Sequence, residues 1–170
     1  MKKILTMVAV LVLFAIYAIP VFAKGPSAPS GKSDTGHLYL VEKNPSDWSI
    51  VNDGSWGKLN YQSSKFIFNG HMLNVSEDYT LINYARVGSE WPAHIVCLGS
   101  AMSDEYGDVH IMGNWDKTNF GHDTTDGTGN PDKYKFWLVP SVDVNCPGGI
   151  LPKWNPSNYL FEEVPVTFSV

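Results

Sequence analysis

The stretch IVCLGSAMSDEYGDVHIMGNW, residues 95–115, has two apolar segments on either side of a polar turn that contains glycine. Residues 94–98 and 109–112 are mostly apolar, whereas residues 103–108 between them are rich in Asp, Ser and Gly. Short apolar runs bounded by turn residues are typical of β-strands. The stretch therefore predicts two strands around a turn, and it places Cys97 within the first strand.

Similar segments recur along the chain, each separated from the next by Gly, Pro, Asn or Asp. They comprise residues 37–41, 48–51, 56–61, 66–68, 79–84, 133–139 and 159–170. After residue 23 no window has apolar residues at helical spacing, so no segment can serve as the crossover helix of a parallel sheet. We therefore predict an all-β fold, a two-sheet antiparallel β-sandwich of the Ig-like kind with about eight to nine strands. A barrel is the alternative.

Two local signals refine this prediction. The Asn69-Gly70 dipeptide follows the 66–68 segment, and Asn-Gly is the strongest short signal for a hairpin turn. Pro165 lacks a backbone N–H and therefore predicts an edge position for the last segment, residues 159–170.

The N-terminal region, residues 1–23, has the three parts of a secretory signal peptide. Lys2 and Lys3 give a positive start, residues 4–19 are apolar, and Pro20 precedes a short ending at Ala23. We expect cleavage after Ala23 and hence a secreted, extracellular or cell-surface protein. The alternative is an uncleaved membrane anchor, because about 20 apolar residues can span a bilayer.

The remaining chain divides into a linker and one domain. Residues 24–36 contain Pro, Ser, Gly and Lys without a large apolar side chain, which predicts a flexible linker. Residues 37–170 then form a single domain of ordinary size. The chain has 12 Lys and Arg against 17 Asp and Glu, and no basic cluster. This charge argues against nucleic acid and against an anionic membrane surface as partners.

The chain has two cysteines, Cys97 and Cys146. In an exported protein, two cysteines most simply pair with each other, so we predict a disulfide between them. They lack neighbouring Cys or His residues at the spacing of zinc ligands. The alternative to a disulfide is a catalytic pair in which Cys97 is the nucleophile and a histidine is the base. Nothing around Cys97 resembles the sequence of a cysteine protease.

Aromatic residues are the first candidates for a binding site. Five tryptophans lie in turns or at the ends of predicted strands, namely Trp48, Trp56, Trp91, Trp115 and Trp154. Exposed rings in such places form the contact surface of many carbohydrate-binding modules. The alternative is that the rings fill the ends of the core, since each can bury a large apolar area.

The polar stretch 116–133 is the candidate metal site. Asp123, Asp126 and Asp132 offer carboxylates to calcium, which takes six to eight oxygen ligands. Their spacing does not match the helical calcium loop, and an ordinary surface loop has the same composition. No other cofactor is expected.

A modification site and a catalytic alternative complete the candidates. Asn74 begins an Asn-X-Ser sequon, so it is a candidate for glycosylation. None of the common catalytic motifs is present, and we expect a protein that is not an enzyme. A hydrolase needs only two well-placed carboxylates, and Asp104, Glu105 and Asp108 are available.

Several blocks of the sequence together resemble an uncharacterised domain of exported and surface proteins of archaea, chiefly methanogens. The blocks are LYLVEKNPSDWSIVNDGSWGKLNY, FIFNGHML, YTLINYA, CLGSAMSDEYGDVHIMG and WNPSNYLFE. The resemblance covers residues 37–163 and implies an Ig-like β-sandwich in an extracellular setting. It implies no activity and no functional residue.

These observations predict a secreted or cell-surface β-sandwich module with a binding or structural role and an unidentified protein or glycan partner. The alternative is a carbohydrate-binding module that uses exposed Trp and Tyr, with calcium as a candidate ligand. A hydrolase built on paired carboxylates is the third hypothesis.

Overall fold

The structure is a computed structural model that describes residues 35–86, 91–121 and 133–167. The predicted signal peptide (1–23) and most of the predicted linker (24–36) lie outside the described residues. The first strand begins at Thr35, two residues before the expected start of the domain at residue 37. Within the described part of the chain, no helix is long and apolar enough to cross a membrane.

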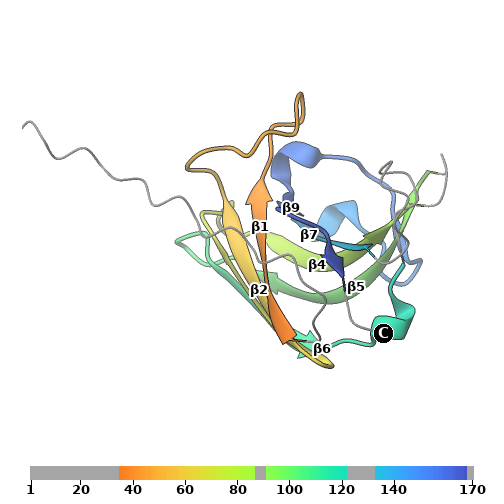
Figure 1. Cartoon of the computed structure of the whole chain (residues 1–170). Coiled ribbons are helices and arrows are strands. Elements are labelled where there is room, and N and C mark those ends of the chain that lie inside the picture. Colours follow the sequence, from red (N-terminus) through yellow and green to blue (C-terminus); the bar gives the residue numbers. More distant parts are fainter. Residues whose placement is uncertain (1–34, 87–90, 122–132, 168–170) are drawn as a thin grey trace, which may run out of the picture.

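Strands dominate the described residues, as predicted (Figure 1). They are β1 (Thr35–Glu42), β2 (Trp56–Gln62), β3 (Lys65–His71), β4 (Asp78–Ala85), β5 (Ala93–Met102), β6 (Val109–Asn114), β7 (Lys133–Pro140), β8 (Ile150–Leu151), β9 (Leu160–Glu162) and β10 (Val166–Thr167). The helical residues form short 3₁₀ turns: η1 (Lys117–Asn119), η2 (Ser141–Asp143) and η3 (Pro156–Asn158). The all-β class is therefore confirmed.

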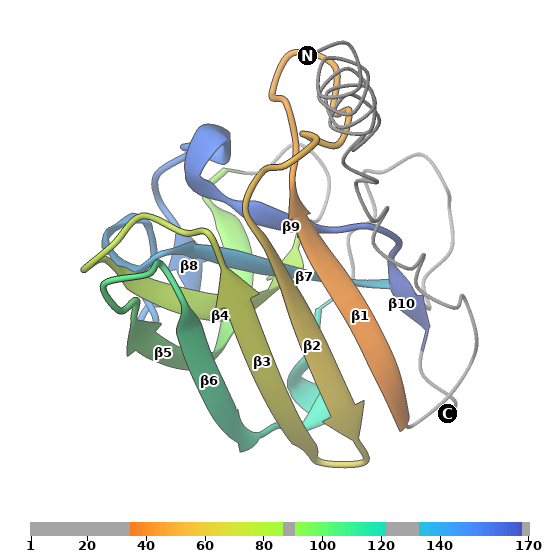
Figure 2. The same ribbon diagram turned by 90° about the vertical axis from the view of Figure 1, so that its left-hand side faces the viewer.

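All strand pairs are antiparallel, and they form one sheet in the order β6-β3-β2-β1-β9-β7-β4-β5-β8, with β10 beside β7. The described strands therefore do not form the predicted two-sheet, Ig-like sandwich. The short strand β9 pairs with β1 on one side and with β7 on the other, so it joins the two halves that a sandwich would keep apart. The sheet instead curls into a half-barrel, with β1, β2, β3 and β6 in front of β7, β4 and β5 (Figure 2).

The inside of this curl holds the larger core, which we call the inner core. Its buried side chains come mainly from β1, β2, β3, β4, β6 and β7 and include Leu40, Leu59, Phe68, Leu81, Ile111, Phe136 and Leu138, whereas β5 adds the partly buried Leu98 and Ala101. They recur at every second position, as expected when one face of each strand is buried. Phe120, which follows η1, and Trp115, which follows β6, complete this core from the loop side.

A second, outer core lies on the opposite face of β4, β7, β9 and β5. It contains Ile82, Tyr84, Ile95, Trp137, Val139, Leu151, Tyr159 and Phe161. Residues 141–159, which we call the covering segment, contribute Leu151 and Tyr159 to this cluster, and Val144 packs against it. The near-continuous burial of β4 and β7 follows from this arrangement, because both faces of these strands are covered.

The stretch 95–115 contains the two predicted strands, but they do not pair with each other. β5 pairs with β4 and β8, whereas β6 pairs with β3 at the far end of the strand order. The stretch thus connects the two ends of the curled sheet. Gly99 allows β5 to approach β6, because a Cβ atom at this position would lie 2.8 Å from Cγ2 of Ile111.

The predicted hairpin turn at Asn69-Gly70 is wrong. Both residues lie within β3, where Gly70 pairs with Gly57 of β2. Gly70 is needed for packing rather than for turning, since a Cβ atom there would lie 2.8 Å from Cγ1 of Val109. The β2–β3 turn is formed instead by Ser63 and Ser64, with Ser63 in the left-handed region at φ 47°.

Candidate functional site

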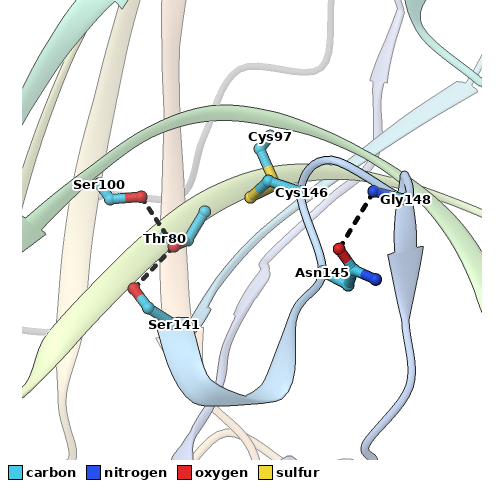
Figure 3. The surroundings of a disulfide bond; sticks show 7 residues. All are labelled: Thr80, Cys97, Ser100, Ser141, Asn145, Cys146 and Gly148. Carbon is cyan, nitrogen blue, oxygen red and sulfur yellow. Dashed lines mark hydrogen bonds between the residues drawn. A yellow bond between two sulfur atoms is a disulfide. The ribbon is translucent and has the colours of Figure 1, made fainter.

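The predicted disulfide is present and joins Cys97 of β5 to Cys146 of the covering segment (Figure 3). Its Cα atoms lie 5.7 Å apart, within the range that disulfides require. Cys97 packs against the outer core, on the same strand face as Ile95. The bond therefore attaches the covering segment to the sheet, and neither cysteine is available as a nucleophile.

Hydrogen bonds hold the start of the covering segment. The buried Thr80 hydroxyl of β4 lies 2.8 Å from the Ser100 hydroxyl and 2.7 Å from the Ser141 hydroxyl (Figure 3). Further along, the Asn145 side chain accepts a hydrogen bond from the Gly148 N–H at 3.1 Å. The segment is thus bonded to β4 at its start, and the turn that contains Cys146 is closed by a hydrogen bond of its own.

Three of the predicted site residues, Trp48, Trp91 and Trp154, come together at the surface. They belong to three different loops, yet the Trp154 ring centroid lies 6.2 Å from that of Trp48 and 6.2 Å from that of Trp91. Each side chain remains 44–50% exposed. We call these three residues the tryptophan cluster, and Trp154 is its centre.

Trp48 is presented by a tight turn. The predicted strand 48–51 is not formed; the only pairing there is the isolated bridge between Lys43 and Ile50. The Trp48 N–H donates to the Asn44 carbonyl at 2.8 Å, and Trp48 has a φ of 60°. This left-handed conformation is unfavourable for a bulky residue and is commonly retained at functional sites.

Trp154 is held by the buried Tyr159. The Tyr159 hydroxyl accepts the Asn155 N–H at 3.1 Å and donates to the Asp143 carboxylate at 3.1 Å, with the Lys153 carbonyl also at 3.1 Å. Burial raises the pKa of the Tyr159 hydroxyl well above its usual value, so it remains a donor. These bonds fix the backbone on both sides of Trp154.

The tryptophan cluster rests on aromatic rings of the outer core. The Trp154 ring lies 5.7 Å from Trp137 and 5.7 Å from Tyr159, and Trp48 makes an edge contact with Phe161 at 5.2 Å. Sequence reasoning did not assign Trp137 or Tyr159 to a site. Their alternating positions in strand-like segments indicate burial, and only the fold shows what they support.

The other two tryptophans of the predicted set lie elsewhere. Trp115 is 5% exposed and belongs to the inner core, so its prediction as a surface ligand-binding residue is wrong. Its ring packs among the aromatic side chains of the inner core, and its indole N–H is satisfied there by the Ser63 carbonyl at 2.8 Å. Trp56 is 39% exposed and lies against His71, with ring centroids 4.5 Å apart, so its ring contact is with β3 and it does not belong to the tryptophan cluster as defined above.

Glu162 of β9 is a buried acid that the sequence did not indicate. It is 6% exposed, and burial raises the pKa of its carboxyl to about 7. The positive charges of Lys135 and Lys43 and the indole of Trp137 act in the opposite direction. Lys43 also donates to the backbone carbonyl of Glu162 at 2.9 Å.

The candidate calcium ligands Asp123, Asp126 and Asp132 lie outside the described residues. Among the residues that are described, no three His, Cys, Asp or Glu side chains are grouped so that they can hold a metal.

Two of the candidate catalytic carboxylates, Asp104 and Asp108, have hydrogen-bond partners within the protein. The Asp104 carboxylate accepts the N–H groups of Tyr106 and Asp108, both at 2.9 Å. Asp108 in turn lies 2.9 Å from Nδ1 of His71. Hydrogen bonding within the turn accounts for the position of the Asp104 carboxylate, and the contact with His71 of β3 accounts for that of Asp108.

The sequon at Asn74 lies in an exposed turn between β3 and β4. Asn74, Val75 and Ser76 are all exposed, and the Asn74 amide donates to Glu77 at 3.2 Å. Glycosylation at Asn74 stays a prediction, with a side chain that is accessible from solvent.

Comparisons with known proteins identify no relative: no family model matches the chain, and no curated protein and no solved structure is similar to it.

Proposed function

We propose that the protein is an exported, non-catalytic binding module of the cell surface whose contact site for carbohydrate is the tryptophan cluster. One observation carries the proposal: Trp48, Trp91 and Trp154 leave three separate loops and meet at the surface while remaining about half exposed. The export part rests on the signal-peptide pattern, the disulfide and the resemblance to exported archaeal domains.

Energetics favour a binding role over a purely structural one. An aromatic ring that serves the core can be covered almost completely, as Trp115 is. Covering the remaining half of a ring of about 200 Å² would contribute about 2–3 kcal/mol at about 25 cal/mol per Å². A ligand that covers the exposed halves of three neighbouring rings would therefore gain binding free energy from each of them. The disulfide and Tyr159 already fix the scaffold that carries Trp154.

Polar groups beside the rings favour carbohydrate as the ligand. Lys153 and Asn155 flank Trp154, both are exposed, and the Asn155 side chain makes no capping hydrogen bond. A sugar ring has apolar C–H groups that pack on an aromatic face and hydroxyl groups that need hydrogen-bond partners at its edge. The arrangement agrees with the common plan of ligand sites, an apolar surface with few polar groups that fix orientation.

Titration of the disulfide-bonded domain with soluble neutral polysaccharides tests the proposal. Tryptophan fluorescence should change saturably with at least one of glucan, mannan and chitin oligosaccharides. Trp154→Ala should weaken that binding at least tenfold, whereas Trp56→Ala, which removes a half-exposed ring outside the cluster, should leave it within twofold. A structural module would show no saturable binding, and equal effects of the two variants would contradict the assigned site.

A further inference from the structure

The angles between the rings of the tryptophan cluster restrict the form of its ligand. Trp91 and Trp154 are nearly perpendicular, with an interplanar angle of 85°, and Trp48 is inclined by 43° to Trp154. A flat ligand surface can lie against only one of two perpendicular rings. The three rings therefore do not form a planar platform.

We infer that the tryptophan cluster binds a single, conformationally free glycan chain and not the flat face of a crystalline polysaccharide. This inference rests on the proposed function. A crystalline face presents sugar rings that are parallel and coplanar, so it needs aromatic rings in one plane. A free chain can rotate about its glycosidic bonds, and successive sugar rings can then meet aromatic faces of different inclination.

Two of the three rings, Trp154 and Trp48, are held at their mutual angle of 43° and cannot readily turn into one plane. Trp154 lies within 5.7 Å of both Trp137 and Tyr159, and the backbone beside it is hydrogen-bonded to the Tyr159 hydroxyl. The Trp48 ring is held by its edge contact with Phe161, and the Trp48 backbone by the hydrogen bond from its backbone N–H to the Asn44 carbonyl. Turning either ring by tens of degrees would break these contacts.

The chemistry around the cluster favours a neutral chain. Lys153 is the exposed charged residue adjacent to Trp154, and its Nζ lies 4.0 Å from the buried Asp143 carboxylate. Its charge is therefore partly balanced within the protein. No concentration of one charge is found among the residues described next to Trp154, and an acidic glycan would gain little there.

The test compares two physical forms of the same polymer. The full domain is mixed with swollen, amorphous cellulose, chitin or mannan and with the crystalline form of each, at equal accessible surface, and the bound fraction is measured. We expect at least tenfold more binding to the swollen form of one polymer and competition by its soluble oligosaccharides. Trp91→Ala should reduce this binding at least fivefold, and Trp56→Ala should not.

The outcomes separate this inference from the proposed function. Equal or stronger binding to the crystalline form, with loss in Trp154→Ala, would overturn the inference and leave the cluster as a carbohydrate site. The absence of binding to either form and to the soluble oligosaccharides would overturn the proposed function, and the inference with it. Because the Trp variants alter half-exposed side chains, circular dichroism of each variant should match that of the wild type.

Discussion

The side chain of Trp115 packs against other aromatic rings and also donates a hydrogen bond to the backbone. Its ring packs within 5.6 Å of Tyr61, Phe66, Phe120 and Phe136. Its indole N–H binds the Ser63 carbonyl, and its backbone N–H binds the Ser64 carbonyl at 2.8 Å. The residue thus fixes the β2–β3 turn onto the open side of the inner core.

Trp115→Ala should lower the free energy of unfolding by about 3–5 kcal/mol, because the change leaves a cavity and removes the hydrogen bond to Ser63. Trp56→Ala should cost less than about 1.5 kcal/mol, since that ring is already partly in solvent. Urea unfolding followed by circular dichroism measures both values. Similar losses in the two variants would mean that Trp115 is not the packing residue described above.

Glu162 gives the fold a pH dependence. In the folded protein the pKa of its carboxyl is raised to about 7, against an ordinary value of 4.5. The folded state therefore keeps a proton that the unfolded chain releases. The contribution to stability is complete below pH 4.5 and is lost as the pH rises towards 7, by roughly 3 kcal/mol in total.

Glu162→Gln should remove this dependence, because an amide does not titrate. The variant should be no more stable than the wild type at pH 5 and at least as stable at pH 8. Its neighbour provides the control: Glu163→Gln should keep the wild-type profile. Unfolding free energies at four pH values between 5 and 8 provide the comparison, and parallel profiles for wild type and Glu162→Gln would refute the role of this acid.

At the scale of elements, the covering segment (141–159) decides which site the protein presents. It covers one face of β4 and β7, carries Trp154, and is bonded to β5 through Cys146. It contains little regular structure of its own: β8 has two residues, and η2 and η3 are single turns. Its position therefore depends on the disulfide, on the buried Tyr159 and on the hydroxyl contacts of Thr80.

Replacement of both cysteines by Ala should lower the free energy of unfolding by about 4 kcal/mol, the chain-entropy value for a loop of about fifty residues. The inner core should survive, since Cys97 packs against the outer core alone. Hydrogen exchange should then rise in residues 141–159 and change little in β2 and β3. Uniform loss of protection across the chain would show that the two cores do not separate in this way.

Most strands could be predicted from the sequence, because alternating burial leaves a visible pattern in β1, β2, β3 and β6. Their order could not. β9 has three residues, and its position between β1 and β7 depends on contacts distant in sequence. The hairpin prediction at Asn69-Gly70 failed for a related reason: a glycine that makes room for Val109 looks the same in sequence as a glycine that turns.

The candidate site was predictable only as a list of residues. Trp48, Trp91 and Trp154 were proposed together with Trp56 and Trp115, and all five lie in turns or at strand ends. What separates them is the long-range packing of loops, which a single sequence does not record. The support under the cluster, Trp137 and Tyr159, has the pattern of ordinary core residues.

At the scale of the whole molecule, the two ends of the curled sheet, β6 and the β5–β8 pair, are stabilised by different contacts. β5 is covered and cross-linked through the disulfide, and β6 comes close to β5 where Gly99 leaves room for Ile111. A disulfide of this kind persists in an oxidising compartment. The architecture thus agrees with the export that the N-terminal 23 residues predict.

The mature protein should begin at Lys24 and contain no free thiol. Mass spectrometry of protein recovered from the producing cells should give a chain that lacks residues 1–23 and is two hydrogens lighter than its reduced form, because the Cys97–Cys146 bond forms after transport.

Ala23→Arg should block cleavage, since a signal peptidase requires a small residue there, and should leave the uncleaved chain with the membranes. Recovery of wild-type, full-length chain in the membrane fraction would instead identify the apolar segment as an anchor. Free thiols in the exported protein would contradict the coupling between export and the disulfide that holds the covering segment.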